Sequence, residues 1–204
     1  GGVLPYDSVF SLCRKAGGRT AAISYSWMSE LYSRAPYVSD RDRVQLDVEG
    51  SIQYGMYYWD DNYPDSHVFA EGECLRKTFD PDFMLYHTMA VDEWGHMKGA
   101  DSAEYANAVA AVGHLIAARM PEWLQTGYQV VVTADHGMNN LGIHVGTEPA
   151  QREVALYIFS DKVENGRFEE NYISQLNVAP LVCKLMGVPA TEGMKQELEI
   201  VFSK

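Results

Sequence analysis

Aspartate and histidine, two residue types that bind zinc-like cations, gather in two short segments of the sequence. Asp92 and His96 have the spacing D-x-x-x-H. Asp135 directly precedes His136, and His144 follows in the same segment. Zinc and similar cations bind imidazole nitrogen and carboxylate oxygen at about 2.0–2.2 Å, and two ions about 4 Å apart can clamp the attacking and leaving oxygens of a phosphoryl displacement. The five residues therefore predict a bimetallic, zinc-type hydrolase site.

Each pair taken alone has a simpler interpretation. An Asp before His-Gly at the end of a strand is often turn chemistry, and Asp92 with His96 could cap or decorate a helix. The ordered combination is more specific, because each member follows a predicted strand. Glycines beside these residues, such as Gly95 and Gly137, would let the backbone approach the ions closely.

Short apolar runs alternate with amphipathic segments along the chain. Strands alternating with helices imply crossover connections and a largely parallel sheet flanked by helices, that is, an α/β fold. Ligands of such sheets collect beyond the carboxyl ends of the strands, where the five residues fall. The predicted strands are 20–25, 83–89, 129–133 and 154–159, and the predicted helices are 8–16, 27–33, 66–78, 102–124 and 174–186.

Residues 35–64 are the least regular part of what we otherwise predict to be a single domain over 1–204. They are rich in Asp, Tyr, Gly and Pro, and we interpret them as a loop-rich insertion with a strand at 44–48. An aromatic cluster near their end either packs over this edge, the interpretation we favour, or stacks on a substrate base or sugar. The cluster comprises Tyr54, Tyr57, Tyr58 and Trp59.

The net charge of −12 argues against a nucleic-acid backbone or an anionic membrane as partner. No segment approaches the roughly 18 apolar residues of a membrane span. Cys13, Cys74 and Cys183 are isolated, which favours buried thiols and a cytoplasmic over a secreted protein. The chain starts without Met, so the start of the parent protein is not visible and its location stays open.

Four stretches resemble the type I phosphodiesterase/nucleotide pyrophosphatase family of the alkaline phosphatase superfamily. The segment D-E-W-G-H at 92–96 is similar to its P-D-x-x-G-H motif, and T-A-D-H-G-M at 133–138 to its T-[AS]-D-H-G-M motif. Residues 178–189 resemble its closing helix, and residues 8–21 an earlier passage. His144 stands where a G-x-H-G histidine falls, although Val145 separates it from Gly146.

The resemblance implies an alkaline phosphatase-like fold and a division of the ligands between two divalent ions. Asp92, His96 and His144 would bind the first ion, and Asp135 and His136 the second. Zinc is usual in the family, and manganese occurs in some branches. The implied substrate is a small phosphorylated molecule, with nucleotides among the candidates.

The family pattern also has an earlier half, with a metal-binding Asp and a Thr or Ser nucleophile, which we do not find here. Ser8 is better explained as a helix cap, and Ser24 and Ser26 are weaker nucleophile candidates. We therefore expect the C-terminal part of a catalytic domain. Its sheet would be incomplete at the N-terminal side, its nucleophile would lie outside the chain, and its exposed sheet edge would favour self-association.

Two classes of function remain open on these grounds. The parent protein would hydrolyse a phosphodiester, pyrophosphate or related phosphoryl bond, while this chain alone would be inactive. Alternatively, the chain is a non-catalytic metal-binding fragment. Other branches of the superfamily, namely phosphonoacetate hydrolases, phosphomutases and sulfatases, are further alternatives.

Overall fold

A computed structural model describes residues 2–167, 172–194, 197–198 and 200–203 of the chain. Contacts between residues divide it into two units. Unit 1 comprises residues 1–58, 70–87 and 160–204, and unit 2 comprises residues 59–69 and 88–159. All five predicted metal ligands belong to unit 2.

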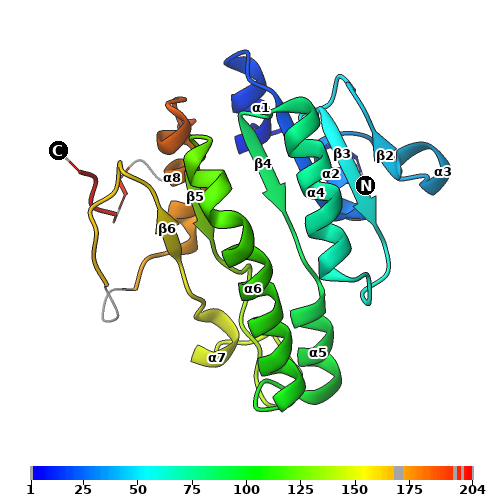
Figure 1. Cartoon of the computed structure of the whole chain (residues 1–204), viewed down its shortest axis with the longest axis vertical. Helices are drawn as coiled ribbons and strands as arrows, with labels where there is room; N and C mark the ends of the chain where they lie inside the picture. The colour runs from blue at the N-terminus through cyan, green and yellow to red at the C-terminus, as the bar shows by residue number, and fades with distance from the viewer. Residues whose placement is uncertain (1, 168–171, 195–196, 199, 204) are drawn as a thin grey trace. The chain divides into compact units, whose positions relative to one another are not determined.

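A four-stranded sheet forms the centre of unit 1 (Figure 1). β1 (Thr20–Tyr25) pairs in parallel with β3 (Tyr54–Tyr58) on one side and with β4 (Phe83–Tyr86) on the other. β2 (Val44–Gln45) is antiparallel to β3, which gives the order β2-β3-β1-β4. The first five residues of β1 are buried, as in a strand covered on both faces. The predicted α/β fold with a largely parallel sheet is confirmed.

Helix α1 (Val9–Lys15) shows how the sequence sets a helix start in unit 1. Ser8 Oγ accepts from the amide of Ser11 at 3.1 Å, and Ser11 Oγ accepts from the amide of Ser8 at 2.8 Å. This reciprocal capping box confirms Ser8 as a cap. Phe10 then packs on Ala22 in the core. The other helices of unit 1 are α2 (Ser26–Tyr32), α3 (Ser39–Asp42), a 3-10 turn (Gln175–Asn177) and α8 (Val178–Met186).

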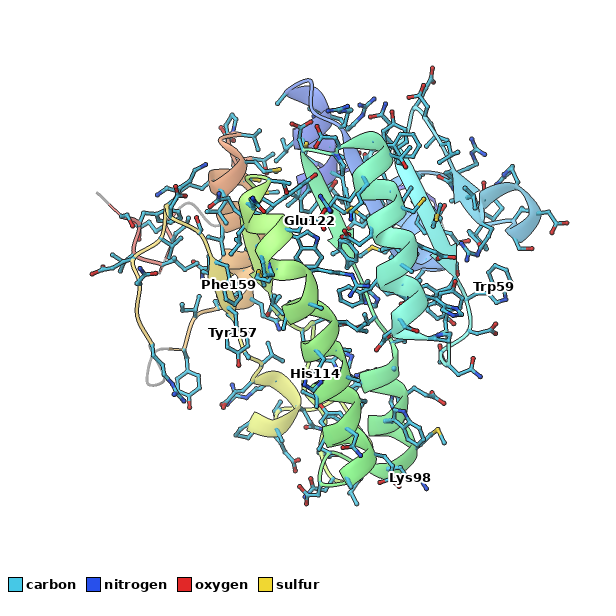
Figure 2. All side chains as sticks on the ribbon, viewed as in Figure 1. Trp59, Lys98, His114, Glu122, Tyr157 and Phe159 are labelled. Carbon is cyan, nitrogen blue, oxygen red and sulfur yellow. The ribbon has the colours of Figure 1, made fainter. Side chains whose placement is uncertain are left out.

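Unit 2 is built on two helices that lie side by side, α5 (Ala90–Lys98) and α6 (Ala103–Gln125) (Figure 1). Helix α4 (Asp65–Phe79) begins in this unit and continues into unit 1. β5 (Val130–Val132) pairs antiparallel with β6 (Tyr157–Phe159), and α7 (Pro149–Arg152) precedes β6. Figure 2 labels the partly exposed Tyr157 and Phe159 on β6. None of the helices in the described residues is long and apolar enough to cross a membrane.

The structure corrects our interpretation of residues 35–64. They contain β3, an inner strand of the sheet, in which Tyr57 and Tyr58 are buried. These two tyrosines therefore belong to the core, as the packing interpretation expects, and Trp59 beyond them is exposed. The Tyr-Gly-Met-Tyr-Tyr sequence of β3 has no run of β-branched residues like that of β5, so its composition does not mark it as a buried strand.

A second correction concerns the strands that precede the candidate ligands. Residues 129–133 are predicted to be a strand of the parallel sheet, but β5 pairs antiparallel with β6. The residues of β5 are also half-buried rather than covered on both faces. A run of valines suits either kind of pairing, so composition alone does not choose between them.

Candidate metal centre

Helix α5 brings Asp92 and His96 together. It is not among the predicted helices, but it converts the D-x-x-x-H spacing into positions i and i+4 on one helix face. His96 Nε2 lies 3.5 Å from Asp92 Oδ2. A helix, rather than the end of a strand, therefore places Asp92 and His96 next to each other.

The loop after β5 carries the other three residues and turns back at Asn139. The side-chain Oδ1 of Asn139 accepts from the amides of Leu141 and Ile143 at 3.0 and 2.9 Å. Gly142 completes the turn with φ of +73°, and a Cβ there would come within 2.7 Å of the carbonyl oxygen of His96. Only glycine combines this conformation with such close approach to α5. The turn thereby returns His144 toward the helix that bears Asp92.

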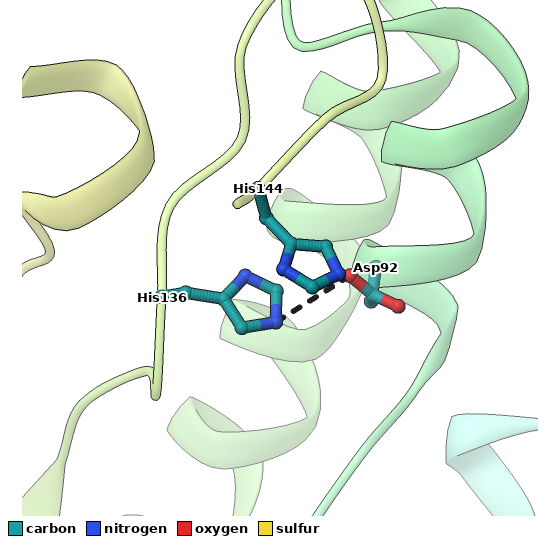
Figure 3. Close-up of side chains that lie close together, drawn as sticks. All are labelled: Asp92, His136 and His144. Atoms are coloured by element: carbon teal, nitrogen blue, oxygen red, sulfur yellow. Dashed lines mark ion pairs between the residues drawn. The ribbon is translucent and has the colours of Figure 1, made fainter. Parts of the chain in front are cut away.

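Asp92, His136 and His144 form the tightest group. Their ligand atoms all lie within 4.8 Å of one another (Figure 3). His136 Nε2 is 3.7 Å from Asp92 Oδ1, and the His136 and His144 rings stack with centroids 3.9 Å apart. Carboxylate oxygen and imidazole nitrogen from two separate segments thus face a common point.

Backbone carbonyls fix the orientation of two of the imidazoles. His96 Nδ1 lies 2.8 Å from the carbonyl oxygen of Gly142, and His136 Nδ1 lies 3.0 Å from that of Gly137. A carbonyl only accepts, so each Nδ1 carries the proton and each Nε2 keeps its lone pair when the ring is neutral. Both Nε2 atoms face Asp92. Histidines that bind metals are held by this kind of bond at their other nitrogen.

One carboxylate oxygen of Asp92 shows whether these residues fit a cation. Its Oδ1 is buried and has no hydrogen-bond partner among the described residues. A buried carboxylate oxygen without a partner is costly, and two lone pairs on nearby imidazoles cannot donate to it. A divalent cation would satisfy the carboxylate and the imidazoles together. The residues present therefore fit a metal ion.

The five predicted ligands form one contiguous group, which we call the Asp/His cluster. Its members are Asp92, His96, Asp135, His136 and His144. Asp135 is the most exposed member, and its Oδ2 lies 3.7 Å from His136 Nε2. Asp92 contacts His96 from one predicted ligand set and His136 from the other. The division of the cluster between two ions stays a prediction.

Two buried polar residues near the cluster escape sequence reasoning, Asp65 and Gln151. Asp65 at the start of α4 is buried, and this burial raises the pKa of its carboxyl above the ordinary value, while the nearby backbone amides of Ala90 and Met89, where α5 begins, oppose the shift. Pro64-Asp65 in sequence signals only a helix start, because the partner amides are distant along the chain. Gln151 has no motif around it at all.

The nucleophile candidates Ser24 and Ser26 and a further histidine, His87, lie in unit 1. Ser24 is buried in β1, and Ser26 is the first residue of α2. His87 follows β4 and meets the Trp27 ring edge-on at 5.2 Å, while its backbone carbonyl accepts from the Tyr58 hydroxyl at 2.6 Å. Packing accounts for these contacts, so they support a structural role for His87.

Comparison with protein families adds an independent observation. The family model described as type I phosphodiesterase / nucleotide pyrophosphatase matches residues 8–166. That range includes the whole Asp/His cluster.

Curated relatives match a large part of the chain at low identity. The catalytic subunit of mouse GPI ethanolamine phosphate transferase 3 is 27% identical over 157 residues, covering 73% of this chain and 14% of that protein. GPI ethanolamine phosphate transferase 2 of Schizosaccharomyces pombe is 25% identical over 132 residues, covering 55% and 17%. A solved structure of murine ectonucleotide pyrophosphatase/phosphodiesterase 5 gives a TM-score of 0.44 at 18% identity, covering 64% of this chain and 32% of that one. The chain thus spans less than a fifth of these curated relatives and about a third of the solved structure.

Proposed function

Because the chain belongs to the type I phosphodiesterase/nucleotide pyrophosphatase family, we propose that its Asp/His cluster binds two divalent ions for the cleavage of a phosphodiester or pyrophosphate bond. The family is one of phosphoryl-transfer enzymes. Zinc is the first candidate ion and manganese the second, since both accept imidazole and carboxylate ligands.

The open carboxylate of Asp92 is the observation that carries this proposal. An oxygen that is buried without a partner among the described residues, beside two imidazole nitrogens with free lone pairs, is a donor set for a cation. Helix α5 and the loop after β5 hold these donors from opposite sides of the group. Such preorganisation supports a role in binding rather than in folding.

Charge indicates the substrate class. The cluster contributes two carboxylates and three imidazoles that are neutral when they act as ligands, so two dications leave it with a net charge of about +2. That charge suits a phosphate dianion or a diester and explains how a chain with net charge −12 could bind one. Bound ions of this kind stabilise phosphoryl oxygens as Lewis acids. The chain's own residues orient the ions and exclude competing ligands.

The attacking group is expected outside this chain, in the earlier half of the family pattern. For that reason the proposed activity refers to the full-length gene product. The phosphoryl acceptor defines two versions of the function. Water as acceptor gives a hydrolase, which we favour from the resemblance to phosphodiesterases. A second hydroxyl as acceptor gives a transferase, which the names of the curated relatives favour.

The test is an assay of bis-p-nitrophenyl phosphate cleavage by the full-length gene product and by the 204-residue chain, each with zinc or manganese. We expect the full-length product to turn over and its His96→Ala variant to lose turnover. We expect the 204-residue chain to bind metal without turnover. A small alcohol added as acceptor separates transfer from hydrolysis by the product formed.

Two results would contradict the proposal in different ways. A full-length product that stays inert with metal bound would remove the enzymatic function and leave a metal-binding protein. Turnover by the 204-residue chain that His96→Ala abolishes would show that the nucleophile lies within it.

A further inference from the structure

Gln151 is a buried polar side chain in an exposed segment. It lies in α7, between His144 and β6, and is 5% exposed, whereas its neighbours on both sides are exposed. A glutamine in a four-residue surface helix would ordinarily be solvated. A buried carboxamide needs hydrogen-bond partners within the protein.

The side-chain amide holds the two residues that flank His144. Gln151 Nε2 donates to the carbonyl of Ile143 at 3.2 Å and to that of Val145 at 3.0 Å. Its Oε1 accepts from the amide of Glu148 at 3.2 Å. Both amide hydrogens and the carbonyl oxygen are thus in use, and the backbone is fixed immediately before and after His144.

The main chain of the same residue holds the other histidine segment. The carbonyl oxygen of Gln151 accepts from the amide of Gly137 at 2.8 Å, directly after His136. One residue therefore connects the segments of His136 and His144, whose rings stack at a centroid distance of 3.9 Å. Changing this connection changes the spacing between two predicted ligands.

Close packing leaves this connection little freedom. A Cβ at Gly146 would overlap the Gln151 carboxamide, and a Cβ at Gly137 would overlap the carbonyl oxygen of Ala150. Among side chains of this length, only glutamine offers two donors and an acceptor on one planar group. Glutamate has the same size and no donor, so it could not bind both carbonyls.

We propose that Gln151 is a positioning residue of the metal centre, which sets the separation of His144 from His136 and so the affinity of the Asp/His cluster for a divalent cation. This inference rests on the metal centre proposed above. Residues that orient metal ligands change metal affinity about 10- to 100-fold when they are replaced. We expect an effect of that size from Gln151.

The test measures the zinc dissociation constant of the full-length gene product by competition with a chromogenic chelator. Gln151→Ala and Gln151→Glu should each weaken binding about 10- to 100-fold. Gln53→Ala is the matched control. Gln53 is also a buried glutamine, and its carboxamide bonds to Asp47 and Arg14 in unit 1. This variant should keep the wild-type dissociation constant.

A spectroscopic readout separates positioning from general loss of structure. Cobalt(II) bound in place of zinc should give a visible absorption spectrum that changes in both Gln151 variants and not in Gln53→Ala. Thermal unfolding without metal checks that each variant is folded, and Gln151→Glu, which keeps the side-chain volume, serves if Gln151→Ala does not fold.

The outcomes distinguish this inference from the proposed function. Unchanged zinc affinity and an unchanged cobalt spectrum in folded Gln151→Glu would overturn the positioning role and leave the metal centre intact. Wild-type protein that binds neither zinc nor cobalt would overturn the metal centre and the positioning role together.

Discussion

Two aspartates, one in each unit, have opposite surroundings. Asp42 in unit 1 is fully buried, and its carboxylate accepts from the guanidinium groups of Arg34 and Arg41 and from the amide of Val38. Asp92 in unit 2 is about a quarter exposed and faces imidazole nitrogens, with one oxygen that lacks a partner among the described residues.

The difference separates a structural carboxylate from a binding one. Arg41 bonds both oxygens of Asp42, at 2.8 Å through Nε and 2.6 Å through a terminal nitrogen, and with Arg34 and the Val38 amide each oxygen has two donors. Asp92 Oδ1 has no hydrogen-bond donor among the described residues, and the neighbouring Nε2 atoms of His96 and His136 carry lone pairs when the rings are neutral, so this carboxylate is free to bind a cation. If burial were the only criterion, Asp42 would be the stronger candidate for a functional carboxylate. The chemistry of the neighbours is the reason that we propose Asp92, and not Asp42, as the metal ligand.

The same substitution at Asp92 and at Asp42 should have different effects on zinc binding. Asp92→Asn removes the charge from the centre of the cluster and should weaken zinc binding by more than about 100-fold, beyond the effect of a residue that only orients a ligand. Asp42→Asn should leave the zinc dissociation constant unchanged. Isothermal titration of both variants checks this, and equal affinities would mean that Asp92 is not a ligand.

The stability of the two variants should show the reverse order. Asp42→Asn removes the buried charged acceptor of the partly exposed Arg34 and Arg41 guanidinium groups and should lower the free energy of unfolding by about 2 kcal/mol. Asp92→Asn should lower it by less in metal-free protein, because Asp92 Oδ1 has no hydrogen-bond donor among the described residues. Urea unfolding without metal measures both, and a larger loss from Asp92→Asn would contradict the assignment.

The pH dependence of Asp42 has a definite sign. Hydrogen bonds from Arg41 hold the pKa of Asp42 below its ordinary value of 3.8. A lowered folded pKa contributes stability that is fully present above the unfolded value and is lost as the pH falls through the folded one. Wild-type stability should therefore fall below about pH 4 more steeply than that of Asp42→Asn, as urea unfolding across pH 2–6 would show. Parallel curves for the two proteins would exclude this role.

Asp65→Asn should change the free energy of unfolding least, and its pH dependence should have the opposite sign to that of Asp42. Burial raises the pKa of Asp65 despite the nearby amides of Ala90 and Met89, so its ionised form costs stability as the pH rises through the folded value. Asp65→Asn keeps an oxygen that can accept from both amides. It should therefore leave the free energy of unfolding at pH 7 unchanged or raise it by less than about 1 kcal/mol. A large loss on urea unfolding would mean that the charge itself stabilises the start of α5.

Much of unit 1 follows from local sequence patterns. The buried run of β1 and the Ser8 cap of α1 are visible in the sequence, because apolar periodicity and capping act over a few residues. β3 is not visible, since its residues are three tyrosines, a glycine and a methionine, whose burial depends on neighbouring strands. The pairing of β5 with β6 likewise depends on tertiary contacts, because a run of valines is compatible with either parallel or antiparallel pairing.

The cluster in unit 2 follows from residue types and their order, while its geometry does not. The sequence selects Asp92, His136 and His144 without revealing that α5 carries the first or that Gln151 links the other two. Contacts between segments far apart in the chain decide these points. The ligand division between two ions, the missing nucleophile and self-association through a sheet edge remain predictions.

Anomalous diffraction from crystals of the zinc-loaded full-length gene product would show whether the Asp/His cluster binds metal. We predict an anomalous peak at the zinc edge among Asp92, His136 and His144, absent in Asp92→Asn, with any second peak showing which ion His96 and Asp135 bind. Zinc bound only elsewhere, with no peak at this cluster under saturating zinc, would contradict the account.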